Sequence, residues 1–270
     1  MITFNHSGGI GDIFYSLHFC KDIIDAVQQE KFNFHIQTNI QDMDMSNQTH
    51  PFGITRMPIS GAEFIKPLLE FQRYINDVTI SDECPEKAIN LDNFRRLKLN
   101  LGAGDIRQWY YNLAINHLKR QFWKPIIDAP IDRKYKDKII LICTERYQNI
   151  LTDYKILKEF KNILVFMGTD KEYQLFNEKY FEIDRVQINS ALDAAEKMNG
   201  AIGVVGNQSG LYSIAECLKV KRIMCAAEII KYGNGIMLGP HNVHPQGGWC
   251  EDVSTTEKLY NSIKEMLKRV

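Results

Sequence analysis

Two glycine-rich turns carry the residue types in this sequence that could do chemistry. Residues 7–12 (SGGIGD) follow an apolar opening run, and residues 206–210 (GNQSG) follow a second apolar run at 201–205. A glycine turn that opens a helix exposes unpaired N–H groups at the positive end of the helix dipole, which favours an anion such as phosphate. The second turn has no acidic residue and adds hydroxyl and amide donors. We therefore expect it to hold a diphosphate.

The first turn contains an acid, Asp12, where a phosphate would otherwise bind. This favours a carboxylate base for an acceptor hydroxyl, with Gly8, Gly9 and Gly11 forming a loop on the acceptor side. The alternative is that Asp12 caps the first helix, because Asp is favoured at helix N-termini. The sequence leaves both interpretations open.

Two other nucleotide sites fit the sequence poorly. A nicotinamide site would need a third glycine where Phe14 stands, and an acid at the end of the second strand, where residues 37–39 read QTN. The P-loop pattern of nucleotide triphosphatases does not occur. Neither class is expected.

The elements that must position these turns are clearest in the second half of the chain. Apolar runs alternate there with segments of helical period, which is typical of βαβ units on a parallel sheet. A capping pair at Ser190 and Asp193 and a stop signal at Gly200 support the boundaries of one helix. We expect strands at 138–143, 162–167, 185–188, 201–205 and 222–226, and helices at 153–160, 171–180, 192–198 and 211–218.

The first half begins with a similar unit and then becomes less regular. Residues 39–60 are polar and contain Pro51 and Pro58, which predicts a long loop. The proline-containing segment 124–132 is the best candidate for an interdomain linker. The expected elements are strands at 1–5, 32–37, 78–80 and 88–91, and helices at 12–29, 61–73 and 105–119.

The sequence predicts two α/β domains and a terminal helix. We place the first domain at residues 1–130, the second at 131–253 and the helix at 254–270, capped by Ser254 and Glu257. The apolar residues of this helix follow an i, i+4, i+7 spacing, so it must pack on something, and we expect that to be the first domain. Residues 233–249, rich in Gly, His and Trp, are expected to form a long loop. His241 and His244 either contact a phosphate or the acceptor there or occur incidentally, and the sequence leaves both interpretations open.

Composition excludes several classes of protein. The chain has 270 residues and equal numbers of basic and acidic residues, so nonspecific nucleic-acid binding is not expected. The short basic run of Arg95, Arg96 and Lys98 is interpreted as a solvated face. Six scattered cysteines, with no export signal and no long apolar stretch, predict a reduced, cytoplasmic protein without a transmembrane segment.

Together the two turns resemble a known family. Residues 7–12 (SGGIGD) and 206–216 (GNQSGLYSIAE) are similar, in order and spacing, to the heptosyltransferase-like glycosyltransferases of family 9, of which this chain looks like a distant and shortened member. The resemblance implies the GT-B fold, in which two Rossmann-like α/β domains face each other across a cleft. It also implies that the C-terminal helix returns to the first domain.

The resemblance also implies roles for individual residues. Asp12 corresponds to the family's general base, and Glu172 to the acid that binds the donor ribose. Two positions keep alternatives: Arg146 could pair with a surface acid, and Glu172 could be a first-turn helix acid favoured by the dipole. The implied donor-binding residues are Thr144, Arg146, Gly168, Glu172, Asn207, Gln208, Ser209, Gly210 and Glu228.

The predicted activity is transfer of a sugar from a nucleotide-diphospho-sugar to a glycan or other hydroxyl acceptor, by an inverting, metal-independent displacement. Asp42 and Asp44 match the metal-binding Asp-x-Asp pattern of another glycosyltransferase fold, GT-A, but the second half of the chain has the wrong topology for that fold. We expect no metal and no cofactor beyond the sugar nucleotide. The alternatives are another sugar-nucleotide enzyme of this fold, an epimerase or a hydrolase, and a non-catalytic nucleotide-binding protein.

Overall fold

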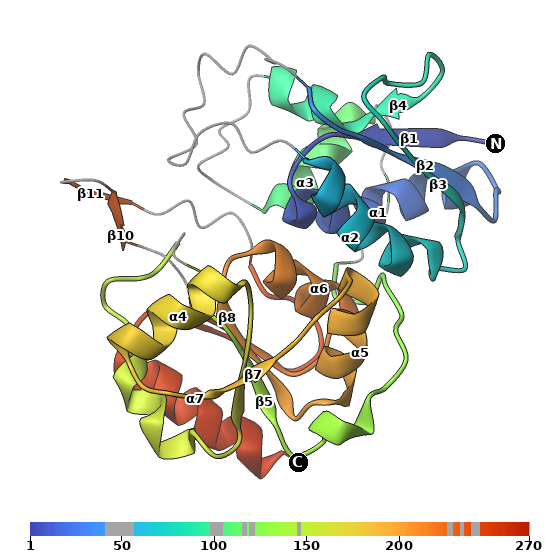
Figure 1. Cartoon of the computed structure of the whole chain (residues 1–270). Helices are drawn as coiled ribbons and strands as arrows, with labels where there is room; N and C mark the ends of the chain where they lie inside the picture. Colours follow the sequence, from blue (N-terminus) through green and yellow to red (C-terminus); the bar gives the residue numbers. More distant parts are fainter. Residues whose placement is uncertain are drawn as a thin grey trace.

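The computed structural model contains two parallel β-sheets, each with its own helices (Figure 1). It describes residues 1–40, 57–97, 105–114, 118, 122–144, 147–225, 229–232, 235–238 and 244–269. The first sheet lies in the N-terminal half and the second in the C-terminal half, as the sequence predicts. The domain boundary near residue 130 stays a prediction.

The first sheet has the strand order β3-β2-β1-β4, and all its pairings are parallel. Its strands are β1 (Thr3–His6), β2 (Phe32–Gln37), β3 (Ile75–Ser81) and β4 (Ile89–Asn90). Its helices are α1 (Ile10–Ala26), α2 (Ile59–Glu70), α3 (Ile106–Tyr110) and the 3-10 helices η1 (Leu91–Arg96) and η2 (Tyr111–Leu113). The helix expected at 105–119 was therefore predicted too long.

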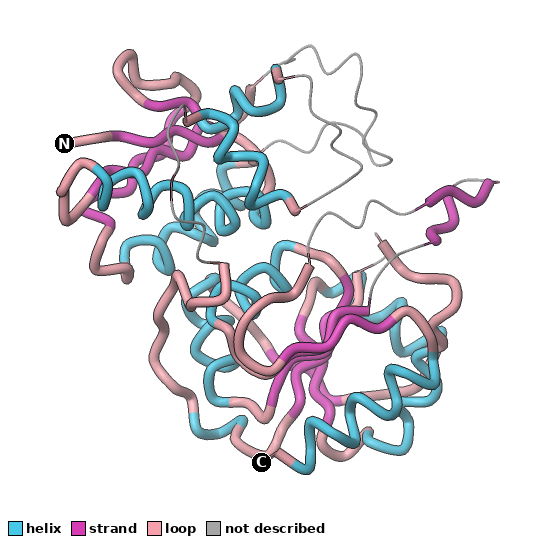
Figure 2. Tube along the Cα trace, turned by 180° about the vertical axis from the view of Figure 1, so that it is seen from behind, coloured by secondary structure: helices cyan, strands magenta, loops and turns pink. Residues whose placement is uncertain are grey.

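The second sheet has the order β12-β9-β8-β5-β6-β7 and is also parallel (Figure 2). Its strands are β5 (Ile139–Ile142), β6 (Leu164–Met167), β7 (Asp184–Val186), β8 (Gly203–Asn207), β9 (Arg222–Cys225) and β12 (Cys250–Val253). Its helices are α4 (Asp170–Lys179), α5 (Ala191–Gly200), α6 (Gly210–Leu218) and α7 (Thr256–Lys268), with 3-10 helices η3 (Arg133–Tyr135) and η4 (Tyr154–Phe160).

Both faces of the second sheet are apolar because helices cover both sides. Along β5, Ile140 and Ile142 belong to one core cluster, and Ile139 and Leu141 belong to the other. Successive side chains of a strand point to opposite faces. This explains why these strands appear in the sequence as continuous apolar runs.

Two features of the C-terminal region differ from the sequence prediction. The expected long loop at 233–249 instead includes part of the antiparallel hairpin formed by β10 (Ile229–Tyr232) and β11 (Gly235–Leu238). Edge strand β12, which pairs with β9, was also missed. Neither feature has the long continuous apolar run that marks the central strands.

The terminal helix α7 packs on the second sheet, so its predicted return to the first domain is wrong. Its apolar residues Leu259, Ile263 and Met266 are fully buried in the core cluster on the face of the second sheet that points away from the first domain. Figure 1 shows the helix, in red, on the second domain. Because only two residues separate β12 from α7, the helix folds back over its own sheet. Its cap is Thr255 and not Ser254, since the Thr255 side chain accepts a hydrogen bond from the Lys258 N–H.

The two domains share one core cluster. Helix α1 packs against α6, and α2 against α5, so apolar residues of both domains belong to the same cluster. Among the described helices, none is both long and apolar enough to span a membrane. The cysteines are all free thiols.

Candidate functional site

Each sheet reverses its strand order at one point, and the two predicted turns lie at these points. In the first sheet the reversal is between β1 and β4, and in the second it is between β5 and β8. Ligands of open α/β sheets bind outside the carboxyl ends of the strands at such a position. The turn at 7–12 follows β1, and the turn at 206–210 begins within β8.

The first turn closes tightly around Asp12. Gly9 is the N-cap of α1, and its N–H donates to Asp12 Oδ2 at 3.2 Å. A Cβ on Gly8 would lie 2.7 Å from both Asp12 Oδ2 and His6 Cε1, so glycine is required there. The hydrogen bond from the Gly9 N–H confirms that Asp12 caps α1. The role of Asp12 as a base stays a prediction.

Asp12 also forms an ion pair that the sequence did not suggest. Arg95 Nη2 lies 2.5 Å from Asp12 Oδ2, and the two side chains are 19% and 26% exposed. Among the described residues, Asp12 Oδ1 accepts no hydrogen bond. The solvated-face interpretation is thus wrong for Arg95, whereas Arg96 is exposed and Lys98 lies outside the described residues.

A buried acid lies behind this pair. Asp92 Oδ2 accepts hydrogen bonds from the Ser7 N–H at 2.7 Å and the Ser7 hydroxyl at 2.8 Å, and Asp92 Oδ1 is 3.1 Å from His6 Nδ1. Burial alone would raise the pKa of Asp92, but His6, Arg95 and Ser7 hold it well below its ordinary value. The turn is therefore attached to a carboxylate that stays ionised.

The second turn opens α6. Ser209 is its N-cap and accepts a hydrogen bond from the Tyr212 N–H at 3.1 Å. Asn207 is fully buried and exchanges hydrogen bonds with the Thr144 backbone, donating to its carbonyl at 2.9 Å and accepting from its N–H at 3.0 Å. Asn207 thus joins the ends of β8 and β5, while Gln208 and Ser209 are partly exposed.

The N-termini of α1 and α6 lie directly against each other. A Cβ on Gly210 would come 2.9 Å from the Ile10 Cβ, and a Cβ on Gly11 would come 3.8 Å from the Ser213 Cβ. The close packing therefore requires glycine at position 210, whereas a Cβ at position 11 would make only ordinary van der Waals contact. The contact brings the positive ends of two helix dipoles, and with them the two turns, to one place.

Glu172 and Gly168 lie together at the start of α4. The Glu172 carboxylate caps that helix, accepting from the N–H and the hydroxyl of Thr169, both at 2.9 Å. A Cβ on Gly168 would lie 3.0 Å from Glu172 Oε2. The first-turn interpretation of Glu172 is therefore confirmed, and ribose binding stays a prediction.

A cavity of about 260 Å³ adjoins this region. Glu172 is at its wall together with the buried thiol of Cys143, whose pKa burial raises to about 12. The lining combines rings and aliphatic carbon with polar groups, and consists of Cys143, Gln148, Glu172, Leu175, Phe176, Glu178, Lys179 and Tyr180. This composition suits an organic ligand with an apolar part and hydroxyl groups.

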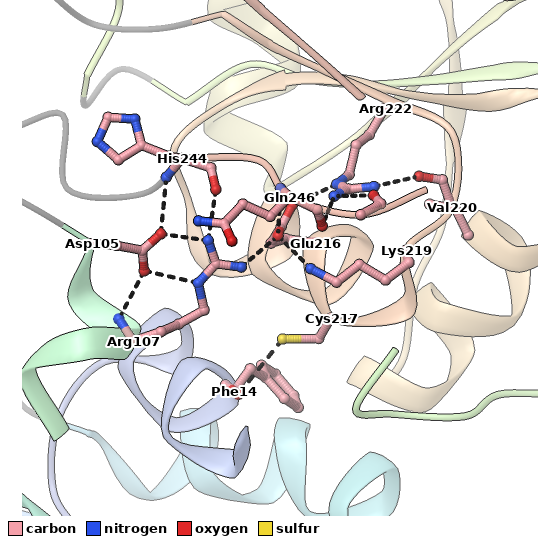
Figure 3. A network of polar contacts seen from close by, with 11 residues as sticks. Phe14, Asp105, Arg107, Glu216, Cys217, Lys219, Val220, Arg222, His244 and Gln246 are labelled. Atoms are coloured by element: carbon pink, nitrogen blue, oxygen red, sulfur yellow. Dashed lines mark hydrogen bonds and ion pairs between the residues drawn. The ribbon is translucent and has the colours of Figure 1, made fainter. Parts of the chain in front are cut away.

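A buried ionic network joins the two domains (Figure 3). Arg107 of α3 donates to Glu216 Oε1 of α6 at 2.6 Å, and it also pairs with Asp105. Arg222 and Lys219 bind the same Glu216 carboxylate. The side chains of Arg107, Glu216 and Arg222 are fully buried.

The network also holds the chain segment that leads into β12. Arg107 Nη2 donates to the His244 carbonyl at 2.6 Å, and Arg222 Nη2 donates to the carbonyls of Gln246 and Gly247 at 2.8 and 2.9 Å. Burial alone would lower the pKa of Arg107, but the carboxylates of Asp105 and Glu216 raise it above its ordinary value. Arg107 therefore keeps its charge although it is buried.

Sequence reasoning missed Arg95 and this network. Glu216 gave the one local signal, a lone acid within the apolar helix sequence GLYSIAECL. Arg146, Glu228, His241, Asp42 and Asp44 lie outside the described residues. Within the part of the chain that the structure describes, no cluster of three potential metal ligands occurs.

Comparison with known proteins reveals the fold. No protein family model and no curated protein matches the sequence. Solved structures do match: a family 9 glycosyl transferase from Veillonella parvula has a TM-score of 0.61 at 10% identity, covering 100% of this chain and 97% of that one. The chain has the GT-B fold.

Two further neighbours were solved with sugar nucleotides. The E. coli heptosyltransferase WaaC with ADP-2-deoxy-2-fluoro heptose has a TM-score of 0.53 at 10% identity, covering 100% of this chain and 99% of WaaC. The dodecameric iron-containing heptosyltransferase TibC, from enterotoxigenic E. coli, in complex with ADP-D-beta-D-heptose, has a TM-score of 0.56 at 11% identity, covering 99% of this chain and 77% of TibC. The resemblance inferred from the two turns is thus confirmed for the fold.

Proposed function

We propose that this protein is a glycosyltransferase that moves a sugar from a nucleoside-diphospho-sugar to an acceptor hydroxyl. The observation that carries the proposal is the contact between the N-termini of α1 and α6, which brings Asp12 next to the turn at 206–210. Both turns lie where their sheets reverse strand order. The fold that the chain shares with family 9 enzymes supports the same activity.

The donor's diphosphate would bind at the N-terminus of α6. Backbone N–H groups there and the polar groups of Gln208 and Ser209 suit the negative charge that grows on the leaving group. Asn207 and Thr144 shape this edge through their mutual hydrogen bonds. Glu172, which lines the cavity, would bind the ribose of the donor nucleoside. Arg146, Glu228 and Gly168 complete the proposed donor site.

The reaction would be one displacement at the anomeric carbon. The acceptor oxygen forms a bond to that carbon while the bond to the diphosphate oxygen breaks, and the nucleoside diphosphate leaves with the electron pair. Asp12 Oδ1 takes the hydroxyl proton. A single displacement inverts the anomeric configuration. The helix dipole replaces a divalent metal in stabilising the leaving group.

Donor binding is tested by thermal unfolding with ADP, UDP, GDP, CDP or dTDP, each with Mg²⁺ and with EDTA. A nucleotide at about 100 times its dissociation constant stabilises the fold by roughly 2.7 kcal/mol, which raises the midpoint by several degrees. We expect one nucleotide to act equally in EDTA. A shift that requires Mg²⁺ would contradict the metal-independent mechanism, and no shift with any nucleotide would contradict the donor site.

The proposed base is tested with Asp12→Asn and a matched control, Asp25→Asn, which changes an exposed acid on the same helix. We expect Asp12→Asn to reduce transfer at least a hundredfold while nucleotide binding persists. Asp25→Asn should behave as the wild type. Product analysis separates transfer from epimerisation and hydrolysis. Near-normal transfer by Asp12→Asn would refute the role of Asp12 as the general base.

A further inference from the structure

Arg95 is the side-chain cation that contacts Asp12, and its own position is fixed. It lies on η1, which directly follows β4, and β4 adjoins β1 at the point where the first sheet reverses its strand order. Its guanidinium carbon lies 4.7 Å from the centre of the Phe94 ring, and its Nε is 3.8 Å from Asp92 Oδ1. These two contacts distinguish Arg95 from a freely moving surface arginine.

The support behind Arg95 is buried. Asp92 is 1% exposed, and its own N–H donates to Asn90 Oδ1 at 2.9 Å, which anchors the start of η1. Its carboxylate binds Ser7 and faces His6. The residue that holds Arg95 is therefore attached to the same turn that contains Asp12.

A second path reaches the Asp12 backbone. His6 Nε2 lies 2.8 Å from the Tyr110 hydroxyl, and that hydroxyl donates to the Asp12 carbonyl at 3.0 Å. Both side chains are fully buried. The main chain and the carboxylate of Asp12 are thus held from two different elements, α3 and η1.

We propose that Arg95, supported by Asp92 and His6, is a positioning residue that fixes the Asp12 carboxylate with Oδ1 toward the acceptor. The proposal rests on the proposed function of Asp12 as base. Arg95 occupies Oδ2, together with the Gly9 N–H, and so leaves Oδ1 as the oxygen that takes the proton. Reaction requires the base within hydrogen-bond reach of the acceptor hydroxyl, and small misplacement lowers the rate strongly.

The positive charge of Arg95 also supports its contact with the Asp12 carboxylate. Burial alone would lower the pKa of Arg95, but Asp12, Tyr110 and Asp92 raise it above its ordinary value, so the guanidinium stays charged. Lys at this position would keep the charge but lose the planar guanidinium that stacks on Phe94.

The test uses Arg95→Met, Arg95→Lys, Asp12→Asn, the double variant Arg95→Met/Asp12→Asn, and Arg96→Met as a control at the exposed neighbouring position of the same 3-10 helix. Release of nucleoside diphosphate, with water as the acceptor, is followed with ADP-heptose, UDP-glucose, GDP-mannose, CDP-glucose and dTDP-glucose. Nitrogen-15 NMR of the arginine side chains provides a readout that needs no donor.

We expect Arg95→Met to lower kcat about tenfold to a hundredfold, with the donor KM changed less than about twofold. Arg95→Lys should recover part of kcat, and Arg96→Met should equal the wild type. In the Asp12→Asn background, Arg95→Met should cause no further loss, because it acts through Asp12. In the NMR spectrum, Asp12→Asn should free the Arg95 Nη groups to exchange with water.

The outcomes separate this inference from the proposed function. A wild type that no nucleotide stabilises against thermal unfolding, and that releases nucleoside diphosphate from no donor, overturns the proposed function and the role of Arg95 with it. If a nucleotide binds but no donor reacts with water, the response of the Arg95 NMR signal to Asp12→Asn decides the positioning role. An active wild type with unchanged kcat in Arg95→Met overturns the positioning role alone. An additive loss in the double variant, a raised KM, or an Arg95 signal insensitive to Asp12→Asn also overturns it. If Arg95→Met fails to fold, Arg95→Gln takes its place in the same comparisons.

Discussion

Acidification should weaken this protein through one histidine buried in α1. His18 is 5% exposed, and its ring packs edge-on against Phe122 with centroids 5.5 Å apart. Its Nε2 has no hydrogen-bond partner among the described residues. Burial first, and then the cations Lys219 and Arg107, lower the pKa of His18 to about 3. The folded protein therefore keeps this ring neutral.

The sign and size of the effect follow from proton linkage. In the unfolded chain His18 has an ordinary pKa of about 6.5. Below that pH the unfolded state therefore binds a proton that the folded state does not bind. Stability is complete above about pH 6.5 and falls as the pH decreases towards 3. Between pH 7 and pH 5 the loss amounts to about 2 kcal/mol.

Urea unfolding of the wild type and of His18→Leu at pH 7 and pH 5 measures this loss. The variant removes the titrating group without adding a polar atom. Between pH 7 and pH 5 its free energy of unfolding should therefore fall by about 2 kcal/mol less than that of the wild type. His244→Gln is the control, because its side chain is exposed. An equal pH dependence in wild type and His18→Leu would refute the reasoning.

Three further predictions concern the packing and the buried ionic network. Gly210→Ala should lower the free energy of unfolding by about 1–3 kcal/mol, because the new Cβ meets Ile10, and Ile10→Ala should restore much of the loss; urea unfolding of the single and double variants measures both. Met266→Ala should cost about 2–5 kcal/mol and increase hydrogen exchange in β8 and β9 before it does so in the first sheet. Glu216→Gln should cost about 3–5 kcal/mol in urea unfolding, because it removes the shared carboxylate of three buried or nearly buried cations. Unchanged stability in any of these variants would contradict the contact it tests.

Most of the secondary structure could be predicted from local patterns. The continuous apolar runs of β5, β6, β8 and β9, the capping pair at Ser190 and the end of α5 at Gly200 are all properties of a few neighbouring residues. The short edge strands β10, β11 and β12 could not be predicted in this way. Their pairing depends on a neighbouring strand and not on a periodic pattern of their own.

The same limit applied to α7. Its spacing of Leu259, Ile263 and Met266 determined that it has an apolar face, and that face is buried. The spacing does not say which surface covers it. The short connection from β12 decided that, because it leaves the helix over its own sheet.

The sequence by itself determined two α/β halves, two glycine turns at helix N-termini and an acid in the first of them. The tertiary structure alone decided which groups meet there. Arg95 and Asp12 are 83 residues apart, and Arg107 and Glu216 are 109 residues apart. Helix caps and strand periodicity arise from neighbours in sequence, whereas these ion pairs exist only because the strand order reverses beside β1 and because α1 packs on α6.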